Sequence, residues 1–461
     1  MADSPHHHTL NDGDRVAVIG GGPAGAFFAY FLLVMARGVG RSLAVDIYEP
    51  RDFAQLGARG CNGCAGIVSE RLMQTFAEDG IELPPAVVQR TIDAYVLHMD
   101  VGSARITPPH QDTHIASVYR GAGPRELRGR AWVGLDAYVL DLAQRQGAQV
   151  VRERVNEVAW VAGRPAVGPS PDQLTRYDLV AVTSGVNSAI LKQFAEAIPG
   201  YQPPRTTKTY IREYFLGSAT VDATLGNAIQ VFLLDIPGLE FGMLIPKGEY
   251  VTACLLGEDM EGDLMERFLA APEVRRVVPM LSADRPSCQC APRINVAAAE
   301  HPFGDRVVFI GDCAATRLYK DGIGSAYRTA KAAAATAVLH GVGADDFRRH
   351  YLPACTAIEQ DNQVGRLIFA LVSQMRRHRF ARRTVLQSIL DEQGRPGRLQ
   401  PMSAVQWDMY TGSGSYRQIA RRLLDPRLLW SLVRGGWGAA FGRWLHRRSA
   451  TVFHVIAHLS K

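Results

Sequence analysis

The sequence predicts an α/β fold in which a parallel sheet flanked by helices receives an inserted antiparallel sheet and is followed by a helical, basic C-terminal region. A glycine-rich segment between a short apolar strand and an apolar helix predicts the parallel part. Alternating apolar and polar residues in the middle of the chain predict the antiparallel sheet. The length of 461 residues allows two or three such structural units.

The composition is that of a globular protein, with 47% hydrophobic and 21% charged residues. The N-terminus lacks a basic region followed by an apolar one, and the longest apolar run, Ala26 to Ala36, is shorter than the roughly 20 residues that a bilayer requires. Seven cysteines, an odd number, argue against a framework of structural disulfides. These features predict a cytoplasmic protein without transmembrane helices.

The segment "RVAVIGGGPAGAFFAYFLL" begins with a strand and passes through Gly20, Gly22, Ala24 and Gly25 into a helix. Glycines at this spacing permit a tight turn and the close approach of the backbone to a pyrophosphate, which the helix N-terminus attracts. The next strand, in "LAVDIYEP", ends in Glu49, 24 residues after Gly25. An acidic residue there suits a hydrogen bond to a ribose 2′-hydroxyl, so the pattern indicates a dinucleotide site.

A second glycine-rich segment, "DRVVFIGDCAATRLYKDGIGSAYRTAKAAAATAVLHG", lies near the other end of the chain. The strand Val307 to Ile310 is followed by Gly311 and Asp312, and Gly322 and Gly324 open an alanine-rich helix. The two segments together resemble the flavoproteins that bind FAD in two separated stretches. That superfamily contains the aromatic hydroxylases and the geranylgeranyl reductases.

The resemblance implies a Rossmann-type FAD-binding domain and a role for particular residues. Asp312 would hold the ribityl chain, while Gly322, Ile323 and Gly324 would form the helix start facing the N1–C2=O edge of the flavin. Reduced flavin is negatively charged near N1, so a helix N-terminus suits it. The family's third motif, strand then "DGxxS", has Ser184 in place of the Asp. Arg130 is the nearest counterpart of an arginine that reaches the cofactor phosphates, although it is slightly out of register.

The middle segment "IQVFLLDIPGLEFGMLIPKGEYVTACLLG" reads as three strands, with turns at Ile236-Pro237-Gly238 and Lys247-Gly248-Glu249. In this segment a strand is followed by the sequence "P-K-G" and then by another strand, a pattern that most resembles the geranylgeranyl reductase branch. The Trp expected there is absent, and Phe241 and Ile245 occupy that neighbourhood. Halogenases of the superfamily carry two Trp residues before an Ile-Pro, and "FGMLIP" has neither.

The stretch "RGCNGCAG" contains Cys61 and Cys64, and "PSCQCAPRI" contains Cys288 and Cys290. The resemblance places Cys64-Ala65-Gly66 in a turn close to the flavin ring. Four thiolates could bind zinc or an iron–sulfur cluster, and two could form a disulfide that exchanges electrons with the flavin. C-x-C is a poor match to the usual zinc-knuckle spacing, and the cysteine spacing resembles no ferredoxin motif, so a turn or substrate-lining role is favoured and no metal site is predicted.

The resemblance implies an FAD-dependent oxidoreductase that reduces a carbon–carbon double bond of a hydrophobic, isoprenoid or quinone-like, substrate by hydride transfer from N5 of reduced flavin. The candidate proton donors are Cys64, Cys61 and Tyr319. The alternatives are an FAD-dependent monooxygenase and an electron-transfer flavoprotein that passes electrons to a quinone or a protein. Only one nucleotide fingerprint is present, so NAD(P)H would visit transiently or a separate reductase partner would supply electrons.

The last third of the chain is basic, with 19 Lys or Arg against 8 Asp or Glu from His340 to Lys461. Trp430, Trp437 and Trp444 recur every seven residues among arginines. Such a segment suits either a helix on an anionic membrane surface, which would make the protein peripheral on the inner face of the membrane, or a helix packed on the protein's own core. No recognition fold for nucleic acid accompanies the charge.

The pattern divides the chain as follows. The FAD-binding domain is expected in three parts at residues 1–84, 126–200 and 293–345, the substrate domain at 85–125 and 201–292, and the helical basic C-terminal region at 346–461.

Overall fold

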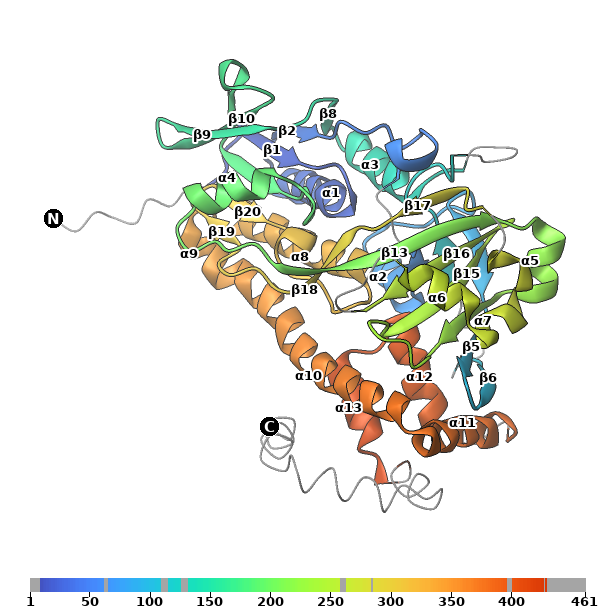
Figure 1. Ribbon diagram of the computed structural model, residues 1–461. Helices are drawn as coiled ribbons and strands as arrows, with labels where there is room; N and C mark the ends of the chain where they lie inside the picture. The colour runs from blue at the N-terminus through green and yellow to red at the C-terminus, as the bar shows by residue number, and fades with distance from the viewer. Residues whose placement is uncertain are drawn as a thin grey trace.

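The computed structural model describes residues 9–61, 65–108, 115–125, 132–257, 263–282, 285–395, 400–426 and 428. It places a parallel sheet with its helices at one end of the molecule, a second sheet beside it, and the C-terminal helices below both (Figure 1). This arrangement confirms the predicted fold class.

The parallel sheet has the strand order β19-β20-β12-β1-β2-β8. Its strands are β19 (Phe303–Gly304), β20 (Val307–Phe309), β12 (Leu179–Val182), β1 (Arg15–Ile19), β2 (Ala44–Tyr48) and β8 (Gln149–Val151). All neighbours are parallel except the edge pair β19 and β20. Strands β12 and β20 are buried at every residue, as expected for strands that are covered on both faces of a sheet.

Three helices bury the apolar surface of this sheet: α1 (Pro23–Gly38), α3 (Leu135–Arg145) and α8 (Gly322–Leu339). Helix α1 contacts both α3 and α8. The face of α8 is built from small side chains, among them the buried Ala330, Ala333 and Ala337, so two helix backbones can approach closely. This packing fixes the start of α8 beside the start of α1.

The second sheet has the order β17-β13-β16-β15-β14-β5-β6, with β18 also pairing with β13. The strands are β5 (Ala94–Met99), β6 (Gly102–Ile106), β13 (Arg205–Phe215), β14 (Ala228–Phe232), β15 (Phe241–Lys247), β16 (Tyr250–Leu256), β17 (Cys288–Cys290) and β18 (Arg293–Ala297). The three strands expected in the middle segment are β14, β15 and β16. The sheet is mixed rather than purely antiparallel, because β5 joins it parallel to β14.

Smaller elements connect these parts. They are η1 (Gly57–Arg59), β3 (Ile67–Val68), α2 (Glu70–Glu78), β4 (Val88–Ile92), β7 (Ile115–Val118), β9 (Glu157–Val161), β10 (Arg164–Gly168), η2 (Pro171–Gln173), β11 (Thr175–Arg176), α4 (Ile190–Ala197), α5 (Ser218–Thr224), α6 (Leu264–Ala270), α7 (Pro272–Val277), η3 (Pro279–Ser282) and η4 (Gly311–Cys313). Strands β3, β7 and β4 form a small antiparallel sheet, and β9, β10 and β11 form another.

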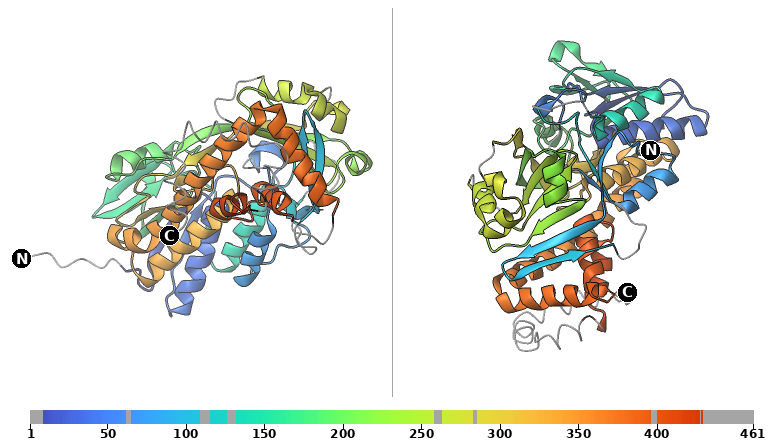
Figure 2. Two further views of the ribbon diagram at one scale, coloured as in Figure 1. Left: turned by 90° about the horizontal axis from the view of Figure 1, so that it is seen from below. Right: turned by 90° about the vertical axis from the view of Figure 1, so that its right-hand side faces the viewer.

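The C-terminal helices are α9 (Ala344–Asp346), the π-helical turn η5 (Phe347–Tyr351), α10 (Leu352–Arg377), α11 (Arg379–Gln393), α12 (Pro401–Thr411) and α13 (Tyr416–Leu423). Helix α10 runs away from the parallel sheet, and the helices after it cover the β5–β6 end of the second sheet (Figure 2). Their apolar side chains share one core with that sheet. Trp430, Trp437 and Trp444 lie outside the described residues. None of the helices described is both long and apolar enough to cross a bilayer.

Candidate functional site

A cavity of about 580 Å³ lies between the parallel sheet and the second sheet. Its volume is in the range of ligand-binding pockets. Its walls include the turn after β1, the end of β2, the start of α8 and one face of the second sheet. The carboxyl ends of β1 and β2 open into it, which is where open α/β sheets bind ligands.

The turn after β1 requires glycine at two positions. Gly20 has a φ of +108°, and a Cβ on Gly25 would lie 1.9 Å from the carbonyl oxygen of Gly20. The hydroxyl of Thr183 donates to the carbonyl oxygens of Ile19 and Gly20 at 2.9 and 2.7 Å, which ties the turn to β12. Gly20, with Gly22 and Ala24, lines the cavity, whereas Gly25 packs behind them.

Glu49 lies at the end of β2 and is only 7% exposed. Its carboxylate accepts hydrogen bonds from the N–H groups of Gly21 at 3.0 Å and Arg51 at 2.9 Å. A carboxylate has about four acceptor positions, so lone pairs remain for a ribose hydroxyl. Because Glu49 also lines the cavity, the geometry is compatible with the role expected from the sequence.

Asp312 lines the cavity where β20 ends and is held by two neighbours. Thr316 donates to its carboxylate at 2.6 Å, and the side-chain amide of Asn295 donates to its carbonyl oxygen at 3.2 Å. Asn295 also borders this cavity, and its Oδ1 atom is buried without a hydrogen-bond partner in the described part of the chain. A buried acceptor of this kind calls for a donor on a ligand.

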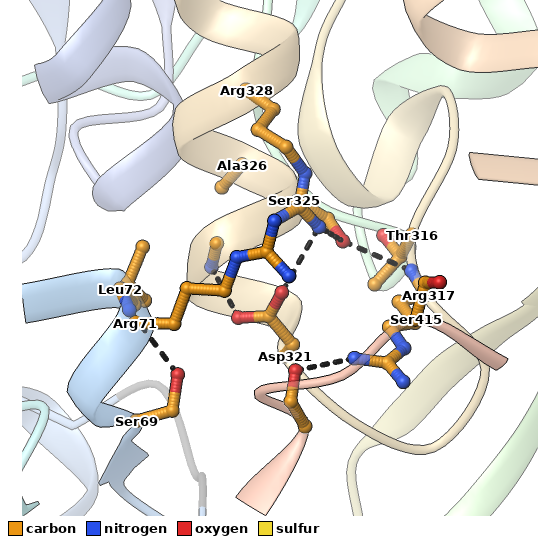
Figure 3. A network of polar contacts seen from close by, with 12 residues as sticks. Ser69, Arg71, Leu72, Thr316, Arg317, Asp321, Ser325, Ala326, Arg328 and Ser415 are labelled. Carbon is orange, nitrogen blue, oxygen red and sulfur yellow. Dashed lines mark hydrogen bonds and ion pairs between the residues drawn. The ribbon is translucent and has the colours of Figure 1, made fainter. Parts of the chain in front are cut away.

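The N-terminus of α8 also borders the cavity, through Gly322 and Ile323. The side chain of Asp321 caps the helix by accepting from the N–H of Gly324 at 3.2 Å, and Arg328 donates to the same carboxylate at 3.0 Å (Figure 3). Gly324, expected to face the flavin edge, therefore has its N–H directed to the cap. The N–H groups before it remain suited to an anion.

Two further expectations concern residues near the entrance. Ser184 lines the cavity in place of the expected Asp, and its hydroxyl lies 3.9 Å from the thiol of Cys313. Arg130 lies outside the described residues. Arg120 lines the cavity and donates to the fully buried carboxylate of Asp136 at 2.8 Å. Asp136 stands in the first turn of α3. An acidic residue at the start of a predicted helix is a signal that could have drawn attention to Arg120, its partner, from the sequence.

The second sheet supplies a largely apolar wall. Ile211 on β13 pairs in register with Cys254 on β16, which pairs with Met243 on β15. Residues opposite each other in neighbouring strands share a face. These three side chains, with Thr209 and Leu256, line the cavity, so a ligand there would contact mainly hydrocarbon and sulfur.

Two of the three proposed proton donors, Tyr319 and Cys61, belong to the described residues, and only Tyr319 of these two lines the cavity. Tyr319 lines the cavity, and its ring meets the Phe369 ring edge-on with centroids 5.0 Å apart. Cys61 is half-buried, does not belong to the described residues that line the cavity, and lies beside Gly121. Cys64 lies outside the described residues. Ala65 and Gly66, at the end of "RGCNGCAG", do line the cavity, so this stretch passes the site.

The two cysteine motifs approach each other, because η1, which precedes Cys61, contacts β17. Cys290 is exposed, while Cys288 is half-buried and its pKa is raised by burial and by the negative charge of Glu213. Among the described residues no group of three or more His, Cys, Asp or Glu side chains is arranged to hold a metal ion.

Sequence reasoning missed two polar residues on the cavity wall, Lys320 and Tyr410. Burial lowers the pKa of Lys320 from 10.5 to about 8, and burial raises the pKa of Tyr410. Lys320 adjoins the glycines that open α8 and could have been found by position. Tyr410 belongs to α12 and reaches the cavity only through tertiary packing.

No family model matches the chain, and no curated protein does. Solved structures do match. A geranylgeranyl bacteriochlorophyll reductase-like protein from Thermoplasma acidophilum has a TM-score of 0.61 at 13% identity, covering 90% of this chain and 100% of that one. A variant of HpxO from Klebsiella pneumoniae, solved with FAD, has a TM-score of 0.57 at 15% identity. This match covers 87% of this chain and 99% of that one. A probable FAD-dependent monooxygenase, pqsL from Pseudomonas aeruginosa, has a TM-score of 0.55 at 13% identity. This match covers 82% of this chain and 100% of that one.

These likenesses establish the fold. The chain shares the overall fold of these solved proteins, which include a reductase-like protein and a probable FAD-dependent monooxygenase, as its two glycine-rich segments predicted.

Proposed function

We propose that the protein is an FAD-dependent oxidoreductase. The single observation that supports this most is the continuous cavity from the glycine turn and Glu49, past Asp312 and the start of α8, to the apolar face of the second sheet. FAD would supply two-electron chemistry at one end, and the sheet would hold the substrate against it.

The residues present fit the cofactor. Glu49 offers acceptor positions for a ribose hydroxyl, the glycine turn brings backbone close to a pyrophosphate, and Asp312 offers a carboxylate to the ribityl hydroxyls. The buried Oδ1 atom of Asn295 is an acceptor in need of a donor, which a ribityl hydroxyl or the flavin ring would provide. The start of α8 stabilises negative charge.

For the reaction we propose reduction of a carbon–carbon double bond in a hydrophobic, isoprenoid or quinone-like substrate. The apolar wall formed by Ile211, Met243 and Leu256 supports this class of substrate. Tyr319 is the proposed proton donor that borders the cavity, and the "P-K-G" turn after β15 supports the reductase branch. NAD(P)H or a partner reductase would supply electrons.

A monooxygenase is the second candidate, favoured by the likeness to the probable monooxygenase from Pseudomonas aeruginosa. The chain itself lacks the Trp pair of the halogenases before Ile245 and Pro246.

Two measurements test these proposals. Flavin released from purified protein, or taken up on reconstitution, should be stoichiometric FAD, and colourless protein that takes up no FAD would contradict the cofactor assignment. Turnover should then be followed by product mass and by oxygen uptake. A product heavier by two hydrogen atoms without oxygen consumption supports the reductase, whereas a product heavier by one oxygen atom with oxygen consumption supports the monooxygenase.

A further inference from the structure

Lys320 is a buried cation that has no counter-charge among the residues that the structure describes. Its side chain is 9% exposed and borders both the main cavity and a small apolar side pocket toward the C-terminal helices. Within the described residues its Nζ atom has a single hydrogen-bond contact, to the thioether sulfur of Met243 at 3.6 Å, and it lies 4.6 Å from the centre of the Phe241 ring. Sulfur and an aromatic face are weak partners for an ammonium group.

Several other charged groups on the same walls are paired within the protein. The pairs are Arg120 with Asp136, Arg317 with Asp361 at 3.9 Å, and Glu240 with Arg376 at 3.3 Å. Glu240 is the acidic residue of the side pocket, and its carboxylate is turned to Arg376. A buried charge is costly unless it is paired, so Lys320 lacks what these neighbours have.

Tyr410 is a second residue that borders both the main cavity and the side pocket and has an unsatisfied polar group in the described structure. It is 4% exposed, and its hydroxyl has no hydrogen-bond partner among the described residues. Its ring is fixed by Tyr95, whose ring centre lies 5.5 Å away and whose hydroxyl donates to the Tyr410 carbonyl oxygen at 3.3 Å. An unsatisfied buried hydroxyl is destabilising, and an acceptor on a ligand would remove that cost.

The backbone that carries Lys320 is strained. Tyr319 and Asp321, on either side of it, have φ values of 60° and 54°, in the left-handed region that costs a non-glycine residue about 1–2 kcal/mol. Arg328 and the N–H of Gly324 hold Asp321 in this conformation (Figure 3). Strain maintained by surrounding contacts is concentrated at functional sites.

We propose that Lys320 and Tyr410 together bind an anionic oxygen group of the substrate, such as a carboxylate. The ammonium group supplies the charge and the phenol a hydrogen bond, while Met243 and Ile211 of the cavity wall contact the apolar body beside it. This inference rests on the proposed function and narrows its substrate class from a hydrophobic molecule to a hydrophobic acid. Lys320 acts as a specificity-determining residue and takes no part in the redox step.

The test compares acids with their neutral amides. Calorimetric titration of the FAD-loaded protein would use 2-naphthoate against 2-naphthamide, and dodecanoate against dodecanamide. At least one acid should bind about tenfold or more tightly than its amide, which corresponds to about 1.4 kcal/mol. Equal affinities for acid and amide in both pairs, or no binding of either acid, would overturn the proposal without any variant.

Variants then assign the preference. Lys320→Met should abolish the preference for the acid, Lys320→Arg should keep most of it, and Tyr410→Phe should weaken acid binding by about threefold. Lys192→Met, which removes an exposed lysine on α4, is the matched control and should bind as the unaltered protein does. Retention of the preference in Lys320→Met would overturn the proposal.

The measurement also separates this inference from the proposed function. A change in FAD affinity or flavin absorption in Lys320→Met, with naphthoate and dodecanoate binding unaltered, would mean that Lys320 faces the cofactor and would overturn the inference alone. Failure to bind FAD would contradict the proposed function, and the same titrations on the cofactor-free protein would still report the preference for acids.

Discussion

The backbone N–H of Gly21 donates a hydrogen bond of 3.0 Å to the carboxylate of Glu49. This bond joins the glycine turn after β1 to the end of β2, so the pyrophosphate and ribose ends of the proposed FAD site share one buried contact. A Cβ on Gly21 would lie 2.8 Å from the Cβ of Glu49, which shows how closely the two segments approach. Glu49 therefore shapes the turn and, in the proposed FAD site, would also contact the ligand.

Replacing Glu49 should weaken FAD binding more than it weakens the fold. Glu49→Ala removes the acceptor for a ribose hydroxyl and should raise the dissociation constant of FAD about 10–100-fold, or by about 1.4–2.8 kcal/mol. Glu49→Gln keeps one oxygen acceptor and should have the smaller effect. Quenching of flavin fluorescence measures the constants, with Glu196→Gln, an exposed position on α4, as control. Unchanged FAD affinity in Glu49→Ala would exclude contact with the cofactor.

Replacing either of two glycines of α1, Gly25 and Gly38, by alanine should have opposite effects on the protein. In Gly25→Ala the new Cβ would lie 1.9 Å from the Gly20 carbonyl oxygen, so the turn must open and FAD binding should be lost. At Gly38 nothing lies within 4 Å of the corresponding Cβ, and alanine should stabilise the end of the helix by up to about 1 kcal/mol. Thermal unfolding and FAD content measure both. Full FAD content in Gly25→Ala would show that the turn can accommodate a methyl group.

The sequence allowed the parallel part of the fold and its glycine turns to be predicted, because these features depend on local rules. Glycine spacing, a preceding apolar strand and an acidic strand end are all visible in one segment. The mixed character of the second sheet could not be predicted, since β5 joins β14 across more than a hundred residues of chain. Tyr410 escaped prediction for the same reason: it reaches the cavity only because α12 packs against the sheet.

A buried acidic residue on the second sheet should be important for stability. The carboxylate of Glu213 accepts from Tyr119 at 2.9 Å and from Thr252 at 2.8 Å, and lies 3.8 Å from the fully buried ammonium group of Lys247. Glu213→Gln leaves Lys247 without a counter-charge and should lower the free energy of unfolding by about 3–5 kcal/mol.

The double variant Glu213→Gln/Lys247→Met should recover part of this loss, because it removes the orphaned charge as well. Urea unfolding of the two single variants and the double variant gives the coupling energy. Strictly additive losses would show that the two groups do not interact.

Lys320→Met should make the protein more stable at neutral pH, because the lysine is costly to bury. Its pKa is about 8 in the folded protein, where desolvation is the largest cause, and about 10.5 in the unfolded chain. Between pH 8 and pH 10.5 the unfolded chain binds more protons than the folded protein does. The destabilisation due to Lys320 therefore has its full value below pH 8 and disappears as the pH rises to 10.5. The stability gained by Lys320→Met should accordingly reach at most about 3 kcal/mol at pH 7 and vanish near pH 10.5.

The measurement is the difference between the unfolding free energies of the two proteins over this pH range. Nearby groups, Cys254 and Arg317 among them, are present in both proteins, so their titration largely cancels in the difference. Lys192→Met should show no such pH-dependent gain. If Lys320→Met were destabilised at pH 7, or if its gain did not depend on pH, the lysine would have a counter-charge in solution, and the case for an anionic substrate group would fail with it.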